Sequence, residues 1–136
     1  MTPNTTKSSQ SSGEPLEHAE HVTFYNQFKK EWPDVLIHSI PNGGKRHPKV
    51  AQEMKAEGLT AGIPDLFIPA WALWVEMKRI SKGTLSKDQE KIITQLEASG
   101  YTVIVAKGWI DGINQVREYH SKMQLDKGFT VGLIYL

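Results

Sequence analysis

Two neighbouring stretches decide the fold of this chain: GIPDLFI at residues 62–68 and WVEMK at residues 74–78. Both are short and rich in β-branched, aromatic and other apolar residues, and residues typical of turns lie beside them. This pattern predicts two strands, 65–69 and 73–78. The interval between them is short enough for an antiparallel hairpin.

Alternation along the second strand brings two charged side chains together. Successive side chains of a strand point to opposite faces, so Glu76 and Lys78 share one face while Val75 and Met77 point into a core. If Asp65 begins the neighbouring strand, its carboxylate meets that of Glu76 across the hairpin. The sequence therefore predicts a pair of carboxylates with an ammonium beside them.

A pair of carboxylates this close favours a bound cation. The two groups repel, and each raises the pKa of the other unless a cation lies between them. Oxygen ligands suit a hard ion such as Mg²⁺ or Mn²⁺, and a metal beside a lysine is suited to the hydrolysis of a phosphodiester. The alternative is that Asp65 caps a turn after Pro64, while Glu76 and Lys78 form a surface ion pair.

Apolar periodicity and turn residues predict the remaining elements of a single α/β domain. Further strands are expected at 35–40 and 102–106, and helices at 16–32, 49–57, 87–99 and 110–120. In chain order this gives α, β, a short α, β, β, α, β and α. Such an order predicts an α/β sandwich in which helices flank a central mixed sheet.

The bulk composition suits one folded domain with extensions at both ends. The chain has 136 residues, of which 39% are hydrophobic, enough for a single core. Residues 1–15 are polar and predict a disordered tail. The folded domain is expected at 16–120. Residues 121–136 end in an apolar run from Phe129, which we expect to pack on the domain or at a dimer interface.

Several classes of protein are disfavoured. There is no cysteine, and the 5 histidines show no spacing typical of a metal site, so zinc is not expected. His38 either donates a hydrogen bond to a phosphate or is a half-buried histidine whose hydrogen bonds are satisfied.

No apolar run approaches the roughly 20 residues of a membrane span, and the N-terminal residues do not resemble a signal peptide. We expect a cytoplasmic protein that does not enter membranes.

The charge pattern indicates only local basic surfaces. The 16 basic and 15 acidic residues give a formal net charge of +1, so any surface for a polyanion must be local. Candidate residues for such a surface are Lys45, Arg46, Lys49, Arg79 and Lys82. The alternative for all of them is an ordinary solvated face.

The motifs resemble a known nuclease family. Pro64-Asp65 followed by Glu76-Met77-Lys78 is similar to the PD-(D/E)XK signature. The surrounding residues resemble its VRR-NUC branch, of the stand-alone type found in phages and bacteria, in five ordered segments: PNGG 41–44, GIPDL 62–66, EMK 76–78, LSKDQ 85–89 and GY 100–101. The resemblance covers roughly residues 17–120. It implies a restriction-endonuclease-like αβββαβ core, dependence on Mg²⁺ or Mn²⁺, and action on DNA.

The resemblance also implies roles for individual residues. Asp65 and Glu76 would be metal ligands, Lys78 the catalytic lysine, and Gln89 a catalytic-site residue on the following helix. The family places a further glutamate on the first helix. Glu20 is our preferred candidate for this third ligand, and the alternative is Glu17, one turn earlier on the same face.

The resemblance finally implies a substrate and an assembly. Proteins of this stand-alone type are similar to Holliday-junction resolvases, which work as homodimers on branched DNA. The alternatives are a nuclease acting on plain duplex or single-stranded DNA, and a DNA-binding module with the same fold that does not cut. The complete set of Asp65, Glu76 and Lys78 argues against the last alternative.

Overall fold

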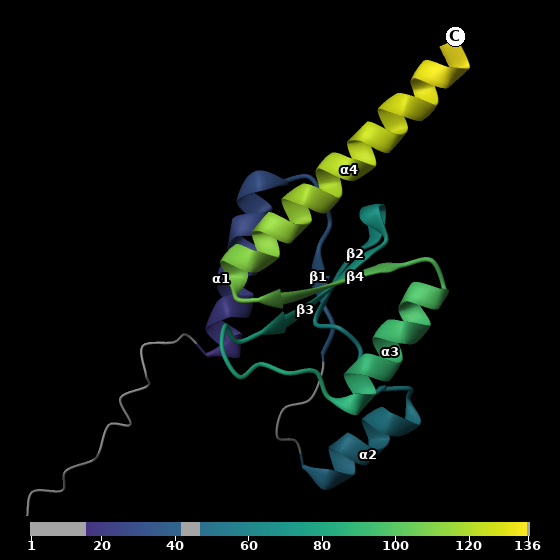
Figure 1. Ribbon diagram of the computed structural model, residues 1–136. Helices are drawn as coiled ribbons and strands as arrows, with labels where there is room; N and C mark the ends of the chain where they lie inside the picture. The colour runs from purple at the N-terminus through teal and green to yellow at the C-terminus, as the bar shows by residue number, and fades with distance from the viewer. Residues whose placement is uncertain (1–15, 42–46, 136) are drawn as a thin grey trace, which may run out of the picture.

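A computed structural model of the chain describes residues 16–41 and 47–135, with side chains described as far as Lys127 (Figure 1). The expected disordered tail at 1–15 lies outside the described residues. Among the residues that are described, no helix is long and apolar enough to cross a membrane.

A mixed four-stranded sheet forms the centre of the domain. Its strands lie in the order β1 (His38–Ser39), β2 (Leu66–Ile68), β3 (Leu73–Lys78) and β4 (Thr102–Lys107). The pairs β1–β2 and β2–β3 are antiparallel, and β3–β4 is parallel. The hairpin predicted from the two motif stretches is present, and the parallel pair is connected through a helix, as is usual for such pairs.

The first strand is much shorter than the prediction of 35–40. Only His38 and Ser39 pair with β2. Ile37 is buried, and Val35 packs against the core while its carbonyl accepts a hydrogen bond from Lys29 Nζ at 3.0 Å. The β-branched residues of this segment therefore reflect packing against the core rather than a long ladder of strand pairing.

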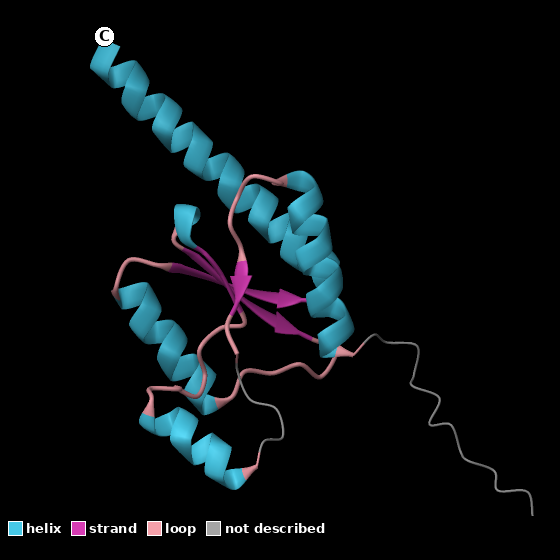
Figure 2. Cartoon of the chain, turned by 180° about the vertical axis from the view of Figure 1, so that it is seen from behind, coloured by secondary structure: helices cyan, strands magenta, loops and turns pink. Residues whose placement is uncertain are grey.

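Within the described residues, the sheet is surrounded by four α-helices: α1 (Glu17–Glu31), α2 (Pro48–Ala56), α3 (Lys87–Ala98) and α4 (Trp109–Tyr135). In both ribbon views α1 and α4 lie together on one side of the sheet, whereas α3 lies on the other side with α2 beyond it (Figures 1 and 2). The predicted α/β architecture with a central mixed sheet is confirmed.

The core fills the space between the sheet and the pair α1 and α4. It contains side chains from both helices and from one face of the strands. The fully buried large side chains in it include Phe24, Phe28, Leu66, Ile68, Leu73, Val75, Met77, Ile113 and Val116. The opposite face of β3, which carries Glu76 and Lys78, is left for the site.

Helix α4 is far longer than the expected 110–120. It continues to Tyr135 without a break at His120, and its last turns extend past the rest of the domain (Figure 1). Lys122 forms an i,i+4 ion pair with Glu118 at 3.1 Å, and Met123 packs against the core. Residues after 120 thus begin as a continuation of the last helix and not as a separate segment.

Candidate active site

Three carboxylates from three separate elements meet at one end of the hairpin. Glu17 is the first residue of α1, Asp65 immediately precedes β2, and Glu76 lies in β3. One oxygen from each lies within 4.8 Å of the others. The register pairs Leu66 with Val75, which brings Asp65 opposite Glu76, as the alternation of the strands indicates.

Backbone hydrogen bonds fix Asp65 within this cluster. Its Oδ2 accepts a hydrogen bond from the backbone N–H of Met77 at 2.8 Å, and its carbonyl accepts one from the N–H of Ile40, also at 2.8 Å. Asp65 is therefore held from both sides, by β3 and by the segment that follows β1. A carboxylate anchored in this way needs little reordering to bind a ligand.

Glu76 is a buried carboxylate whose side-chain partners include Lys78 and Gln89. It is 2% exposed, and its Oε1 lies 3.6 Å from Lys78 Nζ and accepts a hydrogen bond from Gln89 Nε2 at 3.1 Å. Burial raises the pKa of Glu76 to about 8, with the charges of Asp65 and Glu17 adding to the rise and that of Lys78 opposing it. The site thus holds more negative charge than its own residues neutralise.

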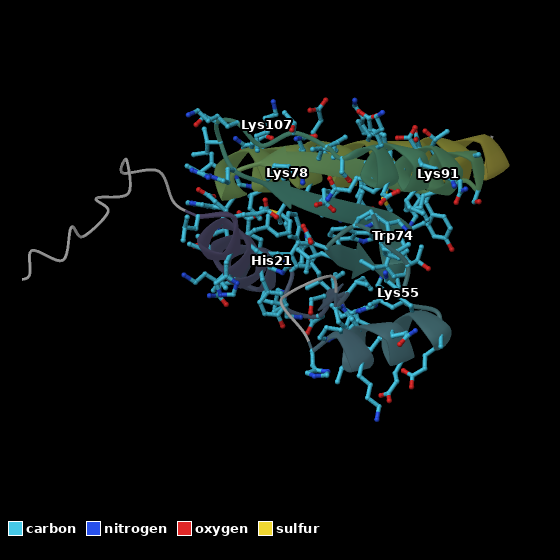
Figure 3. All side chains as sticks on the ribbon, turned by 90° about the horizontal axis from the view of Figure 1, so that it is seen from below. His21, Lys55, Trp74, Lys78, Lys91 and Lys107 are labelled. Atoms are coloured by element: carbon cyan, nitrogen blue, oxygen red, sulfur yellow. The ribbon has the colours of Figure 1, made fainter. Side chains whose placement is uncertain are left out.

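Lys78 shares this face of β3 and is also buried, at 7% exposure. Figure 3 shows it on the same strand as Trp74, in line with the alternation of side chains along β3. An ammonium this far from solvent interacts strongly with nearby negative charge, because the surroundings screen it less than water does. Lys78 therefore suits an anionic group brought to the cluster.

Gln89 joins the start of α3 to the carboxylate cluster. Its Oε1 accepts a hydrogen bond from the backbone N–H of Ser86 at 2.9 Å, while the Ser86 Oγ accepts one from the N–H of Gln89. This reciprocal capping box leaves the Nε2 amide group directed at Glu76. The resemblance places Gln89 near the site, whereas its second role as a helix cap comes from the structure.

Comparisons with known proteins bear on this arrangement. No family model matches the chain, and no curated protein matches it. Among solved structures, the chain is similar to one described as a "VRR_NUC domain protein", with 25% sequence identity and a TM-score of 0.63. The match covers 77% of this chain and 88% of that one. The chain therefore has the fold of a VRR_NUC domain protein. Its core is the restriction-endonuclease-like nuclease core that the motifs indicate.

The third carboxylate of the cluster is Glu17, whereas Glu20, the preferred candidate for the third ligand, lies outside it. The Glu20 side chain turns away from the cluster, and its Oε2 accepts a hydrogen bond from the backbone N–H of Trp109 at 2.5 Å. Trp109 is the first residue of α4, so Glu20 satisfies a free N–H and places a negative charge at the positive end of that helix. Glu17 is therefore the α1 carboxylate that lies together with Asp65 and Glu76.

The candidate DNA-binding residues that the structure describes lie in two regions, the start of α2 and the segment after β3. Lys45 and Arg46 lie outside the described residues. Lys49 is exposed in the first turn of α2, while Arg79 and Lys82 follow β3, directly after Lys78. Of the candidate residues that the structure describes, Arg79 and Lys82 thus lie nearest in sequence to Glu76 of the carboxylate cluster.

Gly62 of the GIPD motif allows the loop before β2 to pack closely against the start of α3. Its φ is +90°, and a Cβ built on it would lie 2.6 Å from the backbone carbonyl of Asp88 and 2.9 Å from the N of Gln89. Only glycine combines this conformation with this approach. The close contact holds the loop that leads to Asp65 against the helix that carries Gln89.

We expect Gly62→Ala to lower the free energy of unfolding by about 3 kcal/mol, because the new methyl group meets backbone that cannot move independently. Gly58→Ala is the matched control, since Gly58 also has a positive φ, +106°, but has open space around it. Its cost should be about 1–2 kcal/mol, from the backbone conformation alone. Urea denaturation measures both, and equal losses would show that the contact with α3 is unimportant.

Proposed function

We propose that this protein is a metal-dependent DNA endonuclease that hydrolyses phosphodiester bonds, with Mg²⁺ or Mn²⁺ bound by Glu17, Asp65 and Glu76. The observation that carries the proposal is the convergence of these three carboxylates beside the buried Lys78 on a VRR-NUC nuclease fold. It acts, on this proposal, in the cytoplasm.

The residues present fit a divalent cation. All three offer carboxylate oxygens, which are the ligands that Mg²⁺ and Mn²⁺ prefer. The raised pKa of Glu76 reflects burial and uncompensated negative charge, which a cation would relieve. When bound, such an ion polarises the phosphodiester, acidifies the attacking water and stabilises the leaving alkoxide.

The side chains around the carboxylates then have separate tasks. The Met77 N–H orients Asp65, and the Gln89 amide orients Glu76. Lys78 offers its ammonium to a phosphate oxygen or to the attacking water, in surroundings where one positive charge strongly stabilises developing negative charge. Gln89 acts through Glu76 and is a positioning residue.

Branched DNA such as a Holliday junction is the substrate that the family resemblance favours. A side-by-side assay of a labelled four-way junction, a nicked duplex, a plain duplex and a single strand tests both the activity and this preference. Cleavage should require Mg²⁺ or Mn²⁺ and stop with EDTA, while Ca²⁺ should support binding without cutting. Undiminished cleavage in EDTA would rule out the proposed chemistry, and faster cleavage of plain duplex would rule out the preference for junctions.

Metal binding should strengthen as the pH rises through about 8. In the metal-free protein the raised pKa of Glu76, about 8 against 4.5, means that its neutral form is favoured by folding. That stabilisation is complete below about pH 4.5 and is lost as the pH rises through about 8. A cation requires the ionised form instead, so it must displace a proton at lower pH.

The rise in melting temperature caused by Mg²⁺ should therefore be larger at about pH 8.5 than at about pH 6.5. Differential scanning fluorimetry measures this shift, and Asp65→Asn, which removes a proposed ligand, is the control. Equal shifts at both pH values would contradict the role given to Glu76. A normal shift in the Asp65→Asn protein would place the cation elsewhere.

A homodimer is part of the proposal, because symmetric cleavage of two strands at a junction needs two active sites related by a two-fold axis. The end of α4, which extends past the domain and has an apolar sequence from Phe129 onwards, is the surface that we nominate (Figure 1). Light scattering should give twice the chain mass of 15.3 kDa. A version lacking residues 129–136 should be monomeric, and a full-length monomer that makes paired symmetric cuts would contradict this geometry.

A further inference from the structure

A groove of about 670 Å³ lies between α1 and β1, beside the carboxylate cluster. One wall comes from α1 and carries His18, His21, Val22 and Tyr25, and the other comes from β1 and its flanking residues. Asp65 lies at its end. Figure 3 shows His21 on the side of α1 that is turned toward the rest of the domain. No pattern in the sequence indicates this groove, because its two walls come from separate elements.

The groove is continuous with the proposed catalytic site. Asp65 belongs both to its lining and to the cluster of three carboxylates, and His18 directly follows Glu17, another member of that cluster. A ligand in the groove would therefore lie next to any phosphate held at the cluster. Its occupant should be a part of the substrate adjacent to the bond that is cut.

The chemistry of the walls suits a nucleotide. His18, His21 and His38 contribute imidazole groups, which can donate hydrogen bonds to phosphate oxygens or to base edges. Tyr25 and Val22 remain 38% and 44% exposed, so a helix that buries Phe24 and Phe28 also leaves aromatic and apolar surface in this groove. Aromatic side chains are the usual platforms on which unpaired bases stack.

The size of the groove suits a single unpaired nucleotide. Its volume lies in the range of about 300–1,000 Å³ typical of sites for single small molecules. A base inside a duplex is stacked and paired and cannot present its faces to such walls. We propose, as an inference that rests on the proposed function, that the groove binds one unpaired nucleotide next to the scissile phosphate. Branched substrates would then be cut where a nucleotide is unpaired at the branch point.

Binding in Ca²⁺ tests this without depending on cleavage. The measurement is fluorescence anisotropy with a labelled single-stranded oligonucleotide and with a plain duplex of the same sequence. The wild-type protein should bind the single strand more tightly. Tyr25→Ala and His21→Ala should each weaken single-strand binding by about tenfold and leave duplex binding unchanged. Tyr25→Phe, which keeps the ring, should bind like the wild type, as should Asn26→Ala, which changes an exposed α1 residue outside the groove lining.

The outcomes separate this inference from the proposed function. Unchanged single-strand affinity in Tyr25→Ala and His21→Ala, or equal losses for both DNA forms, would overturn the groove as a nucleotide site even if the protein cuts DNA in Mn²⁺. Conversely, groove-dependent binding with no cleavage of any substrate in Mn²⁺ would support the groove and reject the nuclease activity. Mg²⁺-induced stabilisation should be normal in all four variants, which shows that the carboxylate cluster is intact.

Discussion

Asp65→Asn should reduce the rate of DNA cleavage by roughly 1,000-fold or more, because it removes a charged metal ligand from the centre of the cluster. The amide is nearly the same size as the carboxyl and can still accept the hydrogen bond from the Met77 N–H. The variant should therefore fold. At about pH 8.5, where Glu76 is ionised, its stability without metal should be equal or higher, since one source of repulsion with Glu76 is gone. Single-turnover cleavage and thermal unfolding measure the two properties.

A matched pair of variants on α1 provides the control. Glu17→Gln should lose most of the cleavage activity with little effect on stability, because Glu17 is exposed and belongs to the cluster. Glu20→Gln should lower the stability and leave the cleavage activity nearly unchanged, because Glu20 caps α4 through Trp109 and lies outside the cluster. Wild-type cleavage by Asp65→Asn or by Glu17→Gln would show that the assigned ligands are wrong.

Lys78→Ala should lower the cleavage rate by about 100- to 1,000-fold while changing DNA affinity in Ca²⁺ by less than about threefold. One buried ammonium contributes little beside the many phosphate contacts of a DNA complex, but much to the single phosphate that reacts. Lys91→Ala is the control, since Lys91 is exposed on α3. A loss of affinity equal to the loss of rate would assign Lys78 to DNA binding instead of catalysis.

Local patterns explain why the central part of the site could be predicted from sequence. Strand alternation places Glu76 and Lys78 on one face, and a tight hairpin leaves one register that brings Asp65 opposite Glu76. These relations involve residues no more than 13 positions apart. The structure places all three as the pattern indicates, while their catalytic roles remain proposals.

The choice between Glu17 and Glu20 depends on a long-range contact. Both lie on the same side of α1, so helical periodicity cannot separate them. The Trp109 N–H that binds Glu20 is 89 positions away in sequence, at the start of α4. Which glutamate reaches the metal site is thus decided by how α1 and α4 pack together.

The shortened β1 and the extended α4 were mispredicted for related reasons. A β-branched run such as 35–40 indicates burial, but pairing requires a partner strand, and β2 offers only three residues. In α4 the apolar periodicity weakens after His120, yet ordinary helix-forming residues and the contact of Met123 with the core continue the helix.

The groove beside Asp65 also depends on tertiary structure, because its two walls come from separate elements.

The central claim is that Glu17, Asp65 and Glu76 together bind the divalent cation. Calorimetric titration of Mn²⁺ into the full-length protein at about pH 8 tests it most directly, with Glu17→Gln, Asp65→Asn and Glu20→Gln measured in parallel. We expect the wild-type and Glu20→Gln proteins to bind Mn²⁺ with similar affinity, and the Glu17→Gln and Asp65→Asn proteins to bind it at least about tenfold more weakly. No detectable binding by the wild type, or equal binding by Asp65→Asn, would contradict the claim.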